Sequence, residues 1–380
     1  MPQAKLAVIW IDWYAYHVAR FEAVANHAAF QGHAAGIELV GGEGVHAGLR
    51  FRDVGRSRLP ITTILPRANW SNTSQWRLAV MLWQRLSEIG PSFVLVPGYY
   101  TLPALSAALW GRLHWARTVL MSESTEADHS RRPWREAIKG TLVRRLFHYA
   151  IVGGTRHREY LQRLGFDTSR IGLRYNVVDN AYFADGVRAL RAVGRPEGFE
   201  ATADYFLYVG RLSPEKNLER LLSSFAEYRR QGGGWRLVLV GDGPSRARLE
   251  TLAIGLDVDD AVTFAGHRST EELLPFYAFA SAFVLPSLRE PWGLVVNEAM
   301  AAGLPVLVSR ICGAADDLVR EGENGFTFAP ESMEDLTRVM LHLSRIPHQS
   351  LREMGQRSQH IIDDFSLTRW ASEVARIAEA

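Results

Sequence analysis

Residues 237–244 read LVLVGDGP, a short apolar run followed by a Gly-Asp-Gly turn and a proline. Such a run is typical of a buried parallel strand, and proline suits the first position of the helix that follows. The two glycines allow backbone to approach a bound group closely. Because the third glycine of a dinucleotide fingerprint is missing, a nicotinamide cofactor is not expected. The stretch therefore predicts one strand–turn–helix unit of a Rossmann-like domain.

The same pattern recurs on both sides of this stretch, as in a parallel sheet covered by helices. In the first half, strands are predicted near residues 5–11, 36–41, 61–65, 92–96, 117–121 and 149–152, and helices near 17–30, 74–88, 102–113, 134–147 and 155–164. In the second half, strands are predicted near residues 205–209, 236–240, 262–264, 282–285, 305–308 and 325–328, and helices near 216–230, 245–254, 271–280, 294–302 and 331–345.

The length of 380 residues is more than one hydrophobic core usually carries, so two domains are expected. The predicted fold class is α/β, with two Rossmann-like, doubly wound domains that face each other across a cleft. In such sheets ligands lie beyond the carboxyl ends of the strands. The predicted parts are a first domain at residues 1–183, a Pro/Gly-containing linker at 184–203, a second domain at 204–355, and a C-terminal helix at 356–380 that crosses back to the first domain.

Charge is distributed unevenly along the chain. Residues 1–200 carry a net charge of +9 and residues 201–380 carry −7, which gives the total of +2. The basic half suits an anionic partner or a membrane surface, although arginine-rich solvated helices explain it equally well. Of the 43 basic residues only three are lysines, so a lysine inside a motif is informative: Lys5, Lys139 and Lys216.

Several features indicate a cytoplasmic protein. No apolar run approaches the roughly 20 residues that span a bilayer. The first predicted strand lacks the basic lead and the cleavage site of a signal peptide. The single cysteine, Cys312, allows no disulfide within the chain and is expected to be a small buried thiol rather than a nucleophile. We therefore expect a soluble, cytoplasmic protein, with peripheral contact at the inner face of the membrane as an alternative.

Residues 208–217 read YVGRLSPEKN and place two cations beside a helix start. The strand ends at Gly210, Ser213 is expected to cap the next helix, and Lys216 is expected in its first turn. A helix N-terminus is a ready anion site, whereas a cation there is mildly unfavourable without a ligand. We therefore expect Arg211 and Lys216 to bind an anion, with ordinary surface charges as the alternative.

Residues 281–303 read SAFVLPSLREPWGLVVNEAMAAG, a buried strand followed by a loop and a helix. Glu290 is expected in the loop and Glu298 inside the helix. At about 1.5 Å per helical residue their separation is at most about 12 Å, comparable with the distance from a transferred sugar to the ribose across a diphosphate. The helix start at residues 293–295 would point free N–H groups at the phosphates.

At this point the second half resembles the donor domain of family 4 glycosyltransferases, which have the GT-B fold, use nucleotide-sugar donors and retain anomeric configuration. Residues 175–179 resemble the family's approach to its hinge, and residues 365–370 resemble the segment that crosses back. Together the matching motifs cover about half of the chain in the correct order: Gly210-Arg211…Lys216-Asn217, residues 241–244, residues 262–266, residues 290–301 and residues 323–325.

The resemblance implies a role for each matching residue. Arg211 and Lys216 would hold the donor diphosphate and its developing charge, Glu298 would accept from the ribose hydroxyls, and Glu290 would contact the transferred sugar. Prearranged cations and helix dipoles would then stabilise the leaving group without a metal or another cofactor. The full set of expected donor-binding residues comprises Gly210, Arg211, Lys216, Gly241, Gly243, Gly266, His267, Glu290, Trp292, Gly293, Leu294, Val295 and Glu298.

Asp257-Val258-Asp259 matches the Asp-x-Asp pattern of metal-dependent transferases, but it lies in a predicted helix-to-strand connector. We interpret it as a surface turn, and no metal site is expected.

The first domain, residues 1–183, is expected to bind the acceptor. Its first strand-to-helix loop carries aromatic residues where many relatives have a glycine pair, and eight of the eleven tryptophans lie in this half. Trp13, Trp70 and Trp76 are predicted in or near loops, where they could stack on a sugar. The expected acceptor-binding residues are Asp12, Trp13, Tyr14, His17 and Trp70.

Residues 122–129 follow the predicted fifth strand and read SESTEADH. Some relatives place a histidine near the position of Glu123. We expect Glu123 or His129 to position or deprotonate the acceptor hydroxyl. The basic stretch at residues 131–147 is expected to be a helix with its apolar stripe in the core, and an anionic membrane is the alternative.

The sequence thus predicts a metal-independent glycosyltransferase, and the resemblance implies that it retains anomeric configuration, with a UDP-sugar as first choice of donor and GDP-mannose as second. The acceptor would be a hydroxyl of a glycan, a lipid-linked molecule or a small molecule, and no nucleic acid is expected. Two alternatives stay open: a nucleotide-sugar 2-epimerase of the same fold and a non-catalytic GT-B binding protein. A phosphorylase is less favoured, because only Lys5, Lys139 and Lys216 are available to hold pyridoxal phosphate.

Overall fold

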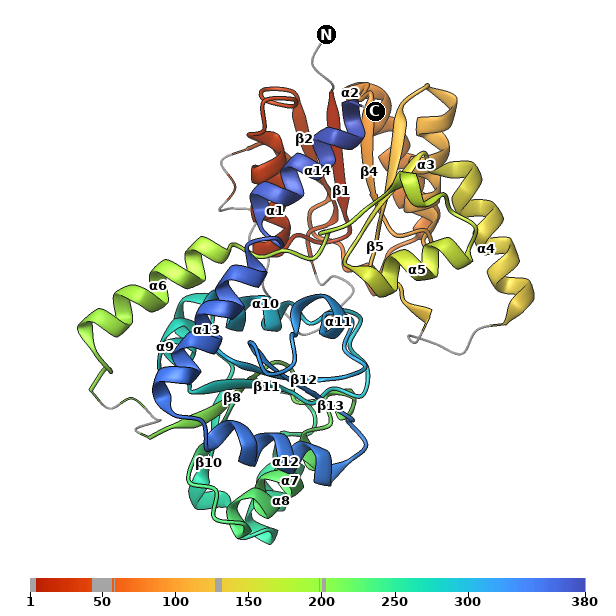
Figure 1. Cartoon of the computed structure of the whole chain (residues 1–380). Helices are drawn as coiled ribbons and strands as arrows, with labels where there is room; N and C mark the ends of the chain where they lie inside the picture. Colours follow the sequence, from red (N-terminus) through yellow and green to blue (C-terminus); the bar gives the residue numbers. More distant parts are fainter. Residues whose placement is uncertain are drawn as a thin grey trace. The chain divides into compact units, whose positions relative to one another are not determined.

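In a computed structural model of the chain, the structure describes residues 5–42, 57, 59–126, 132–197, 199 and 203–379. It divides into two compact α/β units (Figure 1). Unit 1 comprises Met1–Asp179 and Phe365–Ala380, and unit 2 comprises Asn180–Asp364. The chain therefore passes between the units twice, after Asp179 and after Asp364.

Unit 1 contains a seven-stranded parallel sheet with the strand order β3-β2-β1-β4-β5-β6-β7. Val8 of β1 pairs with Gly36 of β2 on one side and with Leu95 of β4 on the other. Strand order reverses between β1 and β4, so their following loops diverge there. The strands are β1 (Leu6–Trp10), β2 (Ala34–Val40), β3 (Ile61–Leu65), β4 (Phe93–Pro97), β5 (Arg117–Ser122), β6 (Tyr149–Val152) and β7 (Ile171–Gly172).

Helices cover this sheet and bury its apolar residues. The C-terminal helix returns to unit 1, where the buried Trp370 donates from Nε1 to the Arg20 carbonyl at 3.1 Å. Arg117 donates to the Ala378 carbonyl at 2.9 Å near the other end of the same helix. The helices of unit 1 are α1 (Ala15–Ala25), α2 (Gln75–Ile89), α3 (Leu102–Leu113), α4 (Pro133–Leu146), α5 (Thr155–Arg163) and α14 (Leu367–Glu379).

Unit 2 contains a six-stranded parallel sheet with the strand order β10-β9-β8-β11-β12-β13. Its switch of order lies between β8 and β11, where Phe206 pairs with Ala282. The strands are β8 (Tyr205–Val209), β9 (Arg236–Val240), β10 (Val262–Gly266), β11 (Ala282–Leu285), β12 (Val306–Ser309) and β13 (Gly325–Phe328). The helices are α6 (Asn180–Val193), α7 (Leu218–Arg230), α8 (Arg246–Gly255), α9 (Thr270–Phe279), α10 (Leu294–Ala301), α11 (Ala315–Leu318), α12 (Met333–Ser344) and α13 (His348–Ile362).

The predicted fold class is confirmed, since both sheets are parallel and Rossmann-like. The expected linker differs, because residues 184–193 belong to α6. Phe183 and Val187 are buried one turn apart on that helix, a spacing obscured in the sequence by polar neighbours. The expected C-terminal helix at 356–380 is also wrong in detail: α13 ends at Ile362 and α14 begins at Leu367.

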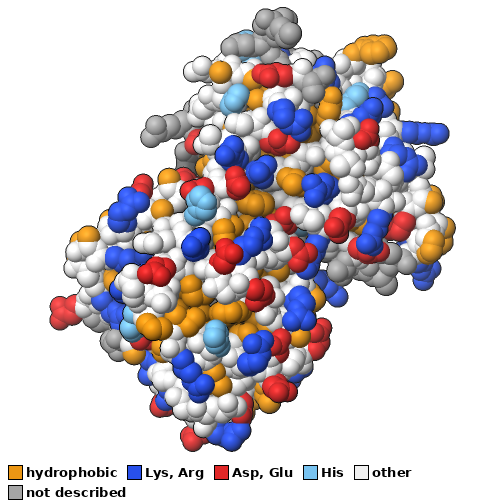
Figure 2. All heavy atoms as spheres, in the orientation of Figure 1, with side chains coloured by type: hydrophobic (Ala, Val, Ile, Leu, Met, Phe, Trp, Pro, Cys, Tyr) orange, Lys and Arg blue, Asp and Glu red, His pale blue; other side chains and the backbone are white. Residues whose placement is uncertain are grey.

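Among the described residues, no helix is long and apolar enough to cross a bilayer. On the face in Figure 2, lysine and arginine side chains are scattered among acidic ones over both units.

Candidate functional site

The residues expected to bind a donor gather at the switch point of the unit 2 sheet. The loop after β8 begins at Gly210, and the loop after β11 begins at Pro286. Because these neighbouring parallel strands lead to helices on different paths, their loops leave a crevice at the carboxyl edge. This position explains why residues far apart in the sequence meet here.

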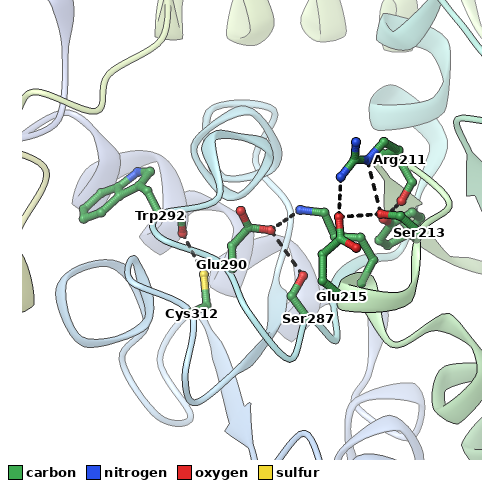
Figure 3. A network of polar contacts seen from close by, with 9 residues as sticks. Arg211, Ser213, Glu215, Ser287, Glu290, Trp292 and Cys312 are labelled. Carbon is green, nitrogen blue, oxygen red and sulfur yellow. Dashed lines mark hydrogen bonds and ion pairs between the residues drawn. The ribbon is translucent and has the colours of Figure 1, made fainter. Parts of the chain in front are cut away.

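An ion pair joins the two loops. Lys216 Nζ lies 2.5 Å from Oε2 of Glu290, and the hydroxyl of Ser287 donates to the same oxygen at 3.2 Å. The Lys216 side chain is 18% exposed and that of Glu290 is 11% exposed, so water screens the pair poorly. Figure 3 shows the Glu290 carboxylate between Trp292 and Glu215, directed toward the cationic loop. The two charged groups expected to act on the donor are thus in direct contact.

Arg211 belongs to a second network beside this pair (Figure 3). It donates from Nη2 to Glu215 Oε1 at 2.5 Å and from Nε to the Ser213 hydroxyl at 3.2 Å. Ser213 in turn donates to the same glutamate oxygen at 2.7 Å. Partial burial alone would raise the pKa of Glu215, but the hydrogen bonds from Ser213 and Arg211 outweigh it and lower that pKa to about 2. Glu215, to which the sequence analysis gave no role, therefore holds Arg211 in place.

Lys216 was expected in the first turn of α7, but it lies before that helix. It ends a 3₁₀ turn, Pro214–Lys216, and Asn217 then takes the left-handed conformation with φ 59° before α7 begins at Leu218. The buried Asn217 amide donates to the carbonyls of Pro286 and Pro330 at 3.1 and 2.8 Å. Asparagine tolerates this backbone conformation, and its side chain fixes the turn against the β11 loop. The turn therefore directs Lys216 to Glu290.

Two glycines of the loop after β9 allow it to pack against the loop after β8. A Cβ on Gly241 would lie 1.9 Å from the Gly210 carbonyl oxygen, and one on Gly243 would lie 2.4 Å from the Leu212 carbonyl oxygen. The loops are joined by hydrogen bonds from Gly210 N–H to Val240 and from Leu212 N–H to Asp242. The absent side chains of these glycines thus leave space for the neighbouring loop, and their expected contact with a donor stays a prediction.

The start of α10 follows Glu290 directly. Gly293 precedes the helix with φ 96°, and Leu294 and Val295 are its half-buried first residues. A Cβ on Gly293 would lie 2.9 Å from Leu285 and 3.2 Å from the Cys312 sulfur, so both conformation and space favour glycine. The first N–H groups of α10 therefore begin beside the Lys216–Glu290 pair, as the spacing of the motif predicts.

Trp292 is a correction. Its side chain is 2% exposed and its Nε1 donates to Asn297 at 2.9 Å, so the indole is part of the core of unit 2 and does not contact a donor. The Trp292 carbonyl accepts from the buried Cys312 thiol at 2.7 Å, which fits the expected structural role of that cysteine. This hydrogen bond links the loop that carries Glu290 to the segment after β12.

Glu298 is 1% exposed and accepts at 2.6 Å from the hydroxyl of the buried Tyr277. This tyrosine was missed by the sequence analysis, because it lies on α9, where its spacing suggests only core packing. Tyr277 fixes one carboxylate oxygen of Glu298, whose contact with ribose stays a prediction.

The remaining residues on this side lie after β10. Gly266 takes φ 73°, its carbonyl accepts from Gly241 N–H at 2.8 Å, and His267 is exposed beside it. Asp257 and Asp259 are exposed between α8 and β10, which agrees with a surface turn. Within the described residues, no group of three or more histidine, cysteine, aspartate or glutamate side chains could hold a metal ion.

In unit 1, the aromatic loop after β1 is more buried than expected. The Trp13 side chain is 0% exposed, its Nε1 donates to the Ile37 carbonyl at 3.1 Å, and its ring packs edge-on against Trp10 and Phe21. The expectation that Trp13 stacks on an acceptor is therefore wrong. Gly36 provides the space for its ring, because a Cβ there would lie 2.7 Å from it.

Asp12, Tyr14 and His17 lie together at the start of α1. The Tyr14 hydroxyl donates to Asp12, and the Tyr14 N–H donates to His17 Nδ1 at 3.3 Å. The His17 ring stacks on Trp10 at 4.7 Å. Burial, followed by the charge of Arg20, lowers the pKa of His17 to about 3, so the imidazole is neutral at pH 7. The group is a fixed polar cluster at the carboxyl edge of the unit 1 sheet.

Glu123 is exposed after β5 and acts electrostatically on a tyrosine that the sequence analysis missed. Desolvation of the hydroxyl raises the pKa of Tyr100, and the charges of Glu123 and Asp12 raise it further. Most of the Tyr100 side chain is nevertheless exposed. The loops after β1, β4 and β5 therefore place Asp12, Tyr100 and Glu123 at the same carboxyl edge of the unit 1 sheet. His129 lies outside the described residues.

A cavity of about 510 Å³ follows β3 in unit 1. Trp70, which is half-buried and packs partly on the core, belongs to the short helix at its border. The polar residues lining the cavity are Arg67, Asn69, Asn72, Thr73, Ser74 and Arg77. The sequence analysis did not single out its two arginines.

Comparison with known proteins agrees with this architecture. Residues 194–360 match the family model described as Glycosyl transferases group 1. The sulfoquinovosyl transferase of Arabidopsis thaliana is 36% identical over 43% of this chain and 32% of that protein. The glycogen synthase of Mycobacterium tuberculosis is 29% identical over 63% of this chain and 56% of that protein. The matched part of this chain thus spans about a third of the length of the sulfoquinovosyl transferase and about half of the length of the glycogen synthase.

Solved structures extend the similarity to both units. Anabaena HepE in complex with UDP has a TM-score of 0.76 at 18% identity, over 99% of each chain. A glycosyltransferase from Rickettsia africae has a TM-score of 0.76 at 13% identity, over 100% of each chain. The chain therefore has the two-domain GT-B fold, and its residues 194–360 match the Glycosyl transferases group 1 model.

Proposed function

We propose that the protein is a retaining glycosyltransferase that transfers a sugar from a nucleotide-diphosphate donor to an acceptor hydroxyl. The observation that carries the proposal is the poorly exposed Lys216–Glu290 pair at the switch point of unit 2, beside the start of α10. The matching domain over residues 194–360 supports it. A UDP-sugar is the favoured donor, because the similar HepE structure contains UDP, and GDP-mannose is the second choice.

In this proposal the diphosphate lies between Arg211, Lys216 and the first N–H groups of α10. Lys216 would exchange part of its contact with Glu290 for a phosphate oxygen. Glu290 would then face the transferred sugar, and Glu298, held by Tyr277, would accept from the ribose. Fixed cations and helix dipoles meet the negative charge that develops on the leaving diphosphate, so the residues can stabilise it without a metal.

The acceptor is proposed to bind unit 1 at the carboxyl ends of its strands, with Glu123 or His129 as the base. The two arginines of the cavity after β3, Arg67 and Arg77, suit an acceptor that carries an anionic group. If Glu123 is the base, Glu123→Gln should abolish transfer while leaving UDP binding intact, whereas unaltered transfer would leave His129 in that role.

Incubation of the purified protein with a UDP-sugar in the presence of EDTA tests the central activity. A transferase slowly hydrolyses its donor without an acceptor, releasing UDP and free sugar. An epimerase of the same fold would change the sugar configuration, and a binding protein would leave the donor unaltered.

A specific observation also favours contact with a membrane. Trp134 and Ile138, one turn apart on α4, are 58% and 60% exposed, although the sequence led us to expect the apolar stripe of this helix in the core. That expectation is wrong for both residues, since the buried face of α4 contains Gly140 and Val143 instead. Figure 2 shows hydrophobic side chains exposed at the edge where Figure 1 places α4.

The outward face of α4 combines these apolar side chains with exposed arginines. The exposed arginines on or next to this helix include Arg132, Arg135 and Arg145. The guanidinium carbon of Arg135 lies 5.2 Å from the centre of the Trp134 ring. Tryptophan and arginine together suit the interface of an anionic bilayer. We propose that α4 holds the enzyme at such a surface, which suits a lipid-linked acceptor.

A further inference from the structure

A second cavity lies in unit 2, at the sheet edge opposite the candidate donor site. It is lined by Asp204 and Ser281, which precede β8 and β11, and by Pro305, which precedes β12. All strands of this sheet are parallel, so their amino ends share one edge and the donor loops share the other. The cavity of about 430 Å³ is therefore separate from the Lys216–Glu290 site, and its size falls within the range of small-molecule pockets.

The described residues that line this cavity give it a positive charge. Arg191 and Arg195 come from α6 and the turn after it, and Arg352 comes from α13. The single acid among them, Asp204, already accepts from the Ser281 hydroxyl at 2.7 Å and lies 3.6 Å from the ring of His348. Three arginines thus line a cavity whose only carboxylate, among the described lining residues, already accepts a hydrogen bond from Ser281.

These arginines have no carboxylate partner in the described part of the chain. Arg191 donates from Nε to the Ala278 carbonyl at 2.8 Å, Arg352 donates to the Gln349 side chain at 2.6 Å, and Arg195 lies 5.4 Å from the ring centre of Phe279. In contrast, Arg188, one turn earlier on α6, pairs with Asp185 at 2.9 Å. Guanidinium groups held by neutral partners keep donors for an anion.

The floor of the cavity is tightly packed. A Cβ on Gly355 of α13 would lie 2.1 Å from the Gly303 carbonyl oxygen, so the helix rests directly on the turn before β12. Gln359 donates to the Ala301 carbonyl at 3.0 Å and fixes the same contact. A site whose walls are already in place binds a ligand at little ordering cost.

We propose that this cavity binds a small phosphate ester, with its phosphate among Arg191, Arg195 and Arg352 and its carbon skeleton against Phe279. Guanidinium groups match phosphate oxygens in charge and geometry, and three of them converge here from two segments. The apolar wall, which Phe279, Leu304 and Leu351 provide, distinguishes an ester from inorganic phosphate. The inference does not depend on the proposed transferase activity.

A ligand at this position would connect the two helices that adjoin the chain crossings. α6 begins directly after Asp179, and α13 ends just before Asp364, where the chain returns to unit 1. The Asn180 side chain already joins their ends by donating to the Ile362 carbonyl at 2.9 Å. An ester bound by Arg191 and Arg352 adds a second link between the same helices, so bound ligand should slow amide exchange in both.

Isothermal titration calorimetry of the full-length protein with glucose 6-phosphate, inorganic phosphate and UDP tests the proposal. We expect saturable binding of glucose 6-phosphate and weaker binding of inorganic phosphate. Arg191→Ala and Arg352→Ala should each weaken binding of glucose 6-phosphate by roughly tenfold. Arg188→Ala, on the same helix but paired with Asp185, should leave it unchanged, and none of these variants should alter UDP binding.

The remaining results separate this site from the donor site. Lys216→Ala should weaken the binding of UDP but not that of glucose 6-phosphate. If Arg191→Ala fails to fold, Arg195→Ala supplies a second cavity variant at an exposed position. Absence of sugar-phosphate binding at millimolar concentration would overturn the proposal. So would equal weakening by Arg188→Ala, or loss of the sugar phosphate with Lys216→Ala, because either result would place the ester elsewhere.

Discussion

Lys216 Nζ and Glu290 Oε2 lie 2.5 Å apart, although the two residues are separated by 74 positions in the chain. The contact exists because the loops after β8 and β11 diverge at the switch point of the unit 2 sheet. This poorly exposed pair links the two loops, and it also holds the cation of Lys216 and the carboxylate of Glu290 next to each other. Its two members should therefore respond differently to substitution.

Lys216→Ala should weaken UDP binding by roughly tenfold or more, because a cation beside the phosphates is lost. Glu290→Gln should not weaken UDP, since it releases Lys216 from its carboxylate partner, but it should reduce transfer by roughly a hundredfold. Calorimetry with UDP and an assay of sugar transfer measure the two effects. Arg248→Ala, which removes an exposed cation of unit 2 that pairs with Glu219, is the control for charge alone. Equal loss of UDP binding in both variants of the pair would contradict the assigned roles.

Gly241→Ala should destabilise unit 2 by about 2–5 kcal/mol, because a Cβ meets the Gly210 carbonyl and the backbone holds φ 140°. Gly255→Ala is the matched control, since that residue ends α8 with no atom within 4 Å of the added carbon. It should be neutral or slightly stabilising. Chemical denaturation of both variants gives the comparison. A Gly241→Ala protein as stable as Gly255→Ala would show that the β8 and β9 loops are not packed as described.

His17 should make unit 1 sensitive to acid. Its pKa falls to about 3 in the folded protein through burial and the charge of Arg20, whereas an unfolded histidine titrates near 6.5. Between these pH values the unfolded chain binds a proton that the folded protein excludes, so stability falls as pH falls, by at most about 1.4 kcal/mol per pH unit. His17→Gln should remove this component, and the exposed His33→Gln should retain it. Parallel stability curves for the wild type and His17→Gln from pH 7 to pH 4 would contradict the burial of the ring.

The α4 surface should direct binding to anionic vesicles. Replacing Trp134 and Ile138 together by Ala should weaken co-sedimentation with phosphatidylglycerol vesicles by roughly tenfold, because their apolar area no longer enters the interface. Trp115→Ala is the control, since Trp115 is 95% exposed but lies outside α4. Donor hydrolysis in solution should be unchanged in both proteins. Equal weakening by Trp115→Ala, or no wild-type binding, would exclude a membrane role for α4.

Much of the fold could be predicted from the sequence, because strand and helix periodicities are local. The failures have physical causes. Trp13 was expected at the surface because it follows a strand end, but the absence of a side chain at Gly36 opens a buried site for its ring. The helix at residues 17–30 ends at Ala25, and the helix over residues 184–193 was missed because its buried face is narrow.

The candidate donor residues could be named from their motifs, but their contacts could not. Nothing local in the sequence indicates that Lys216 meets Glu290, that Tyr277 supports Glu298, or that Gly241 accommodates a neighbouring loop. The arginine-lined cavity could not be predicted for the same reason, since Arg191 and Arg352 lie on α6 and α13, two helices distant in the sequence that both pack on α10.

The most direct test of the central claim is a thermal-shift comparison of the wild type and Lys216→Ala with UDP, GDP, ADP and dTDP, in EDTA. A ligand that binds only the folded state raises its apparent stability. The account predicts that one diphosphate, with UDP favoured, raises the midpoint of the wild type and has a much smaller effect on Lys216→Ala. No shift with any diphosphate, or the same shift in both proteins, would contradict a nucleotide-diphosphate site at the Lys216–Glu290 pair.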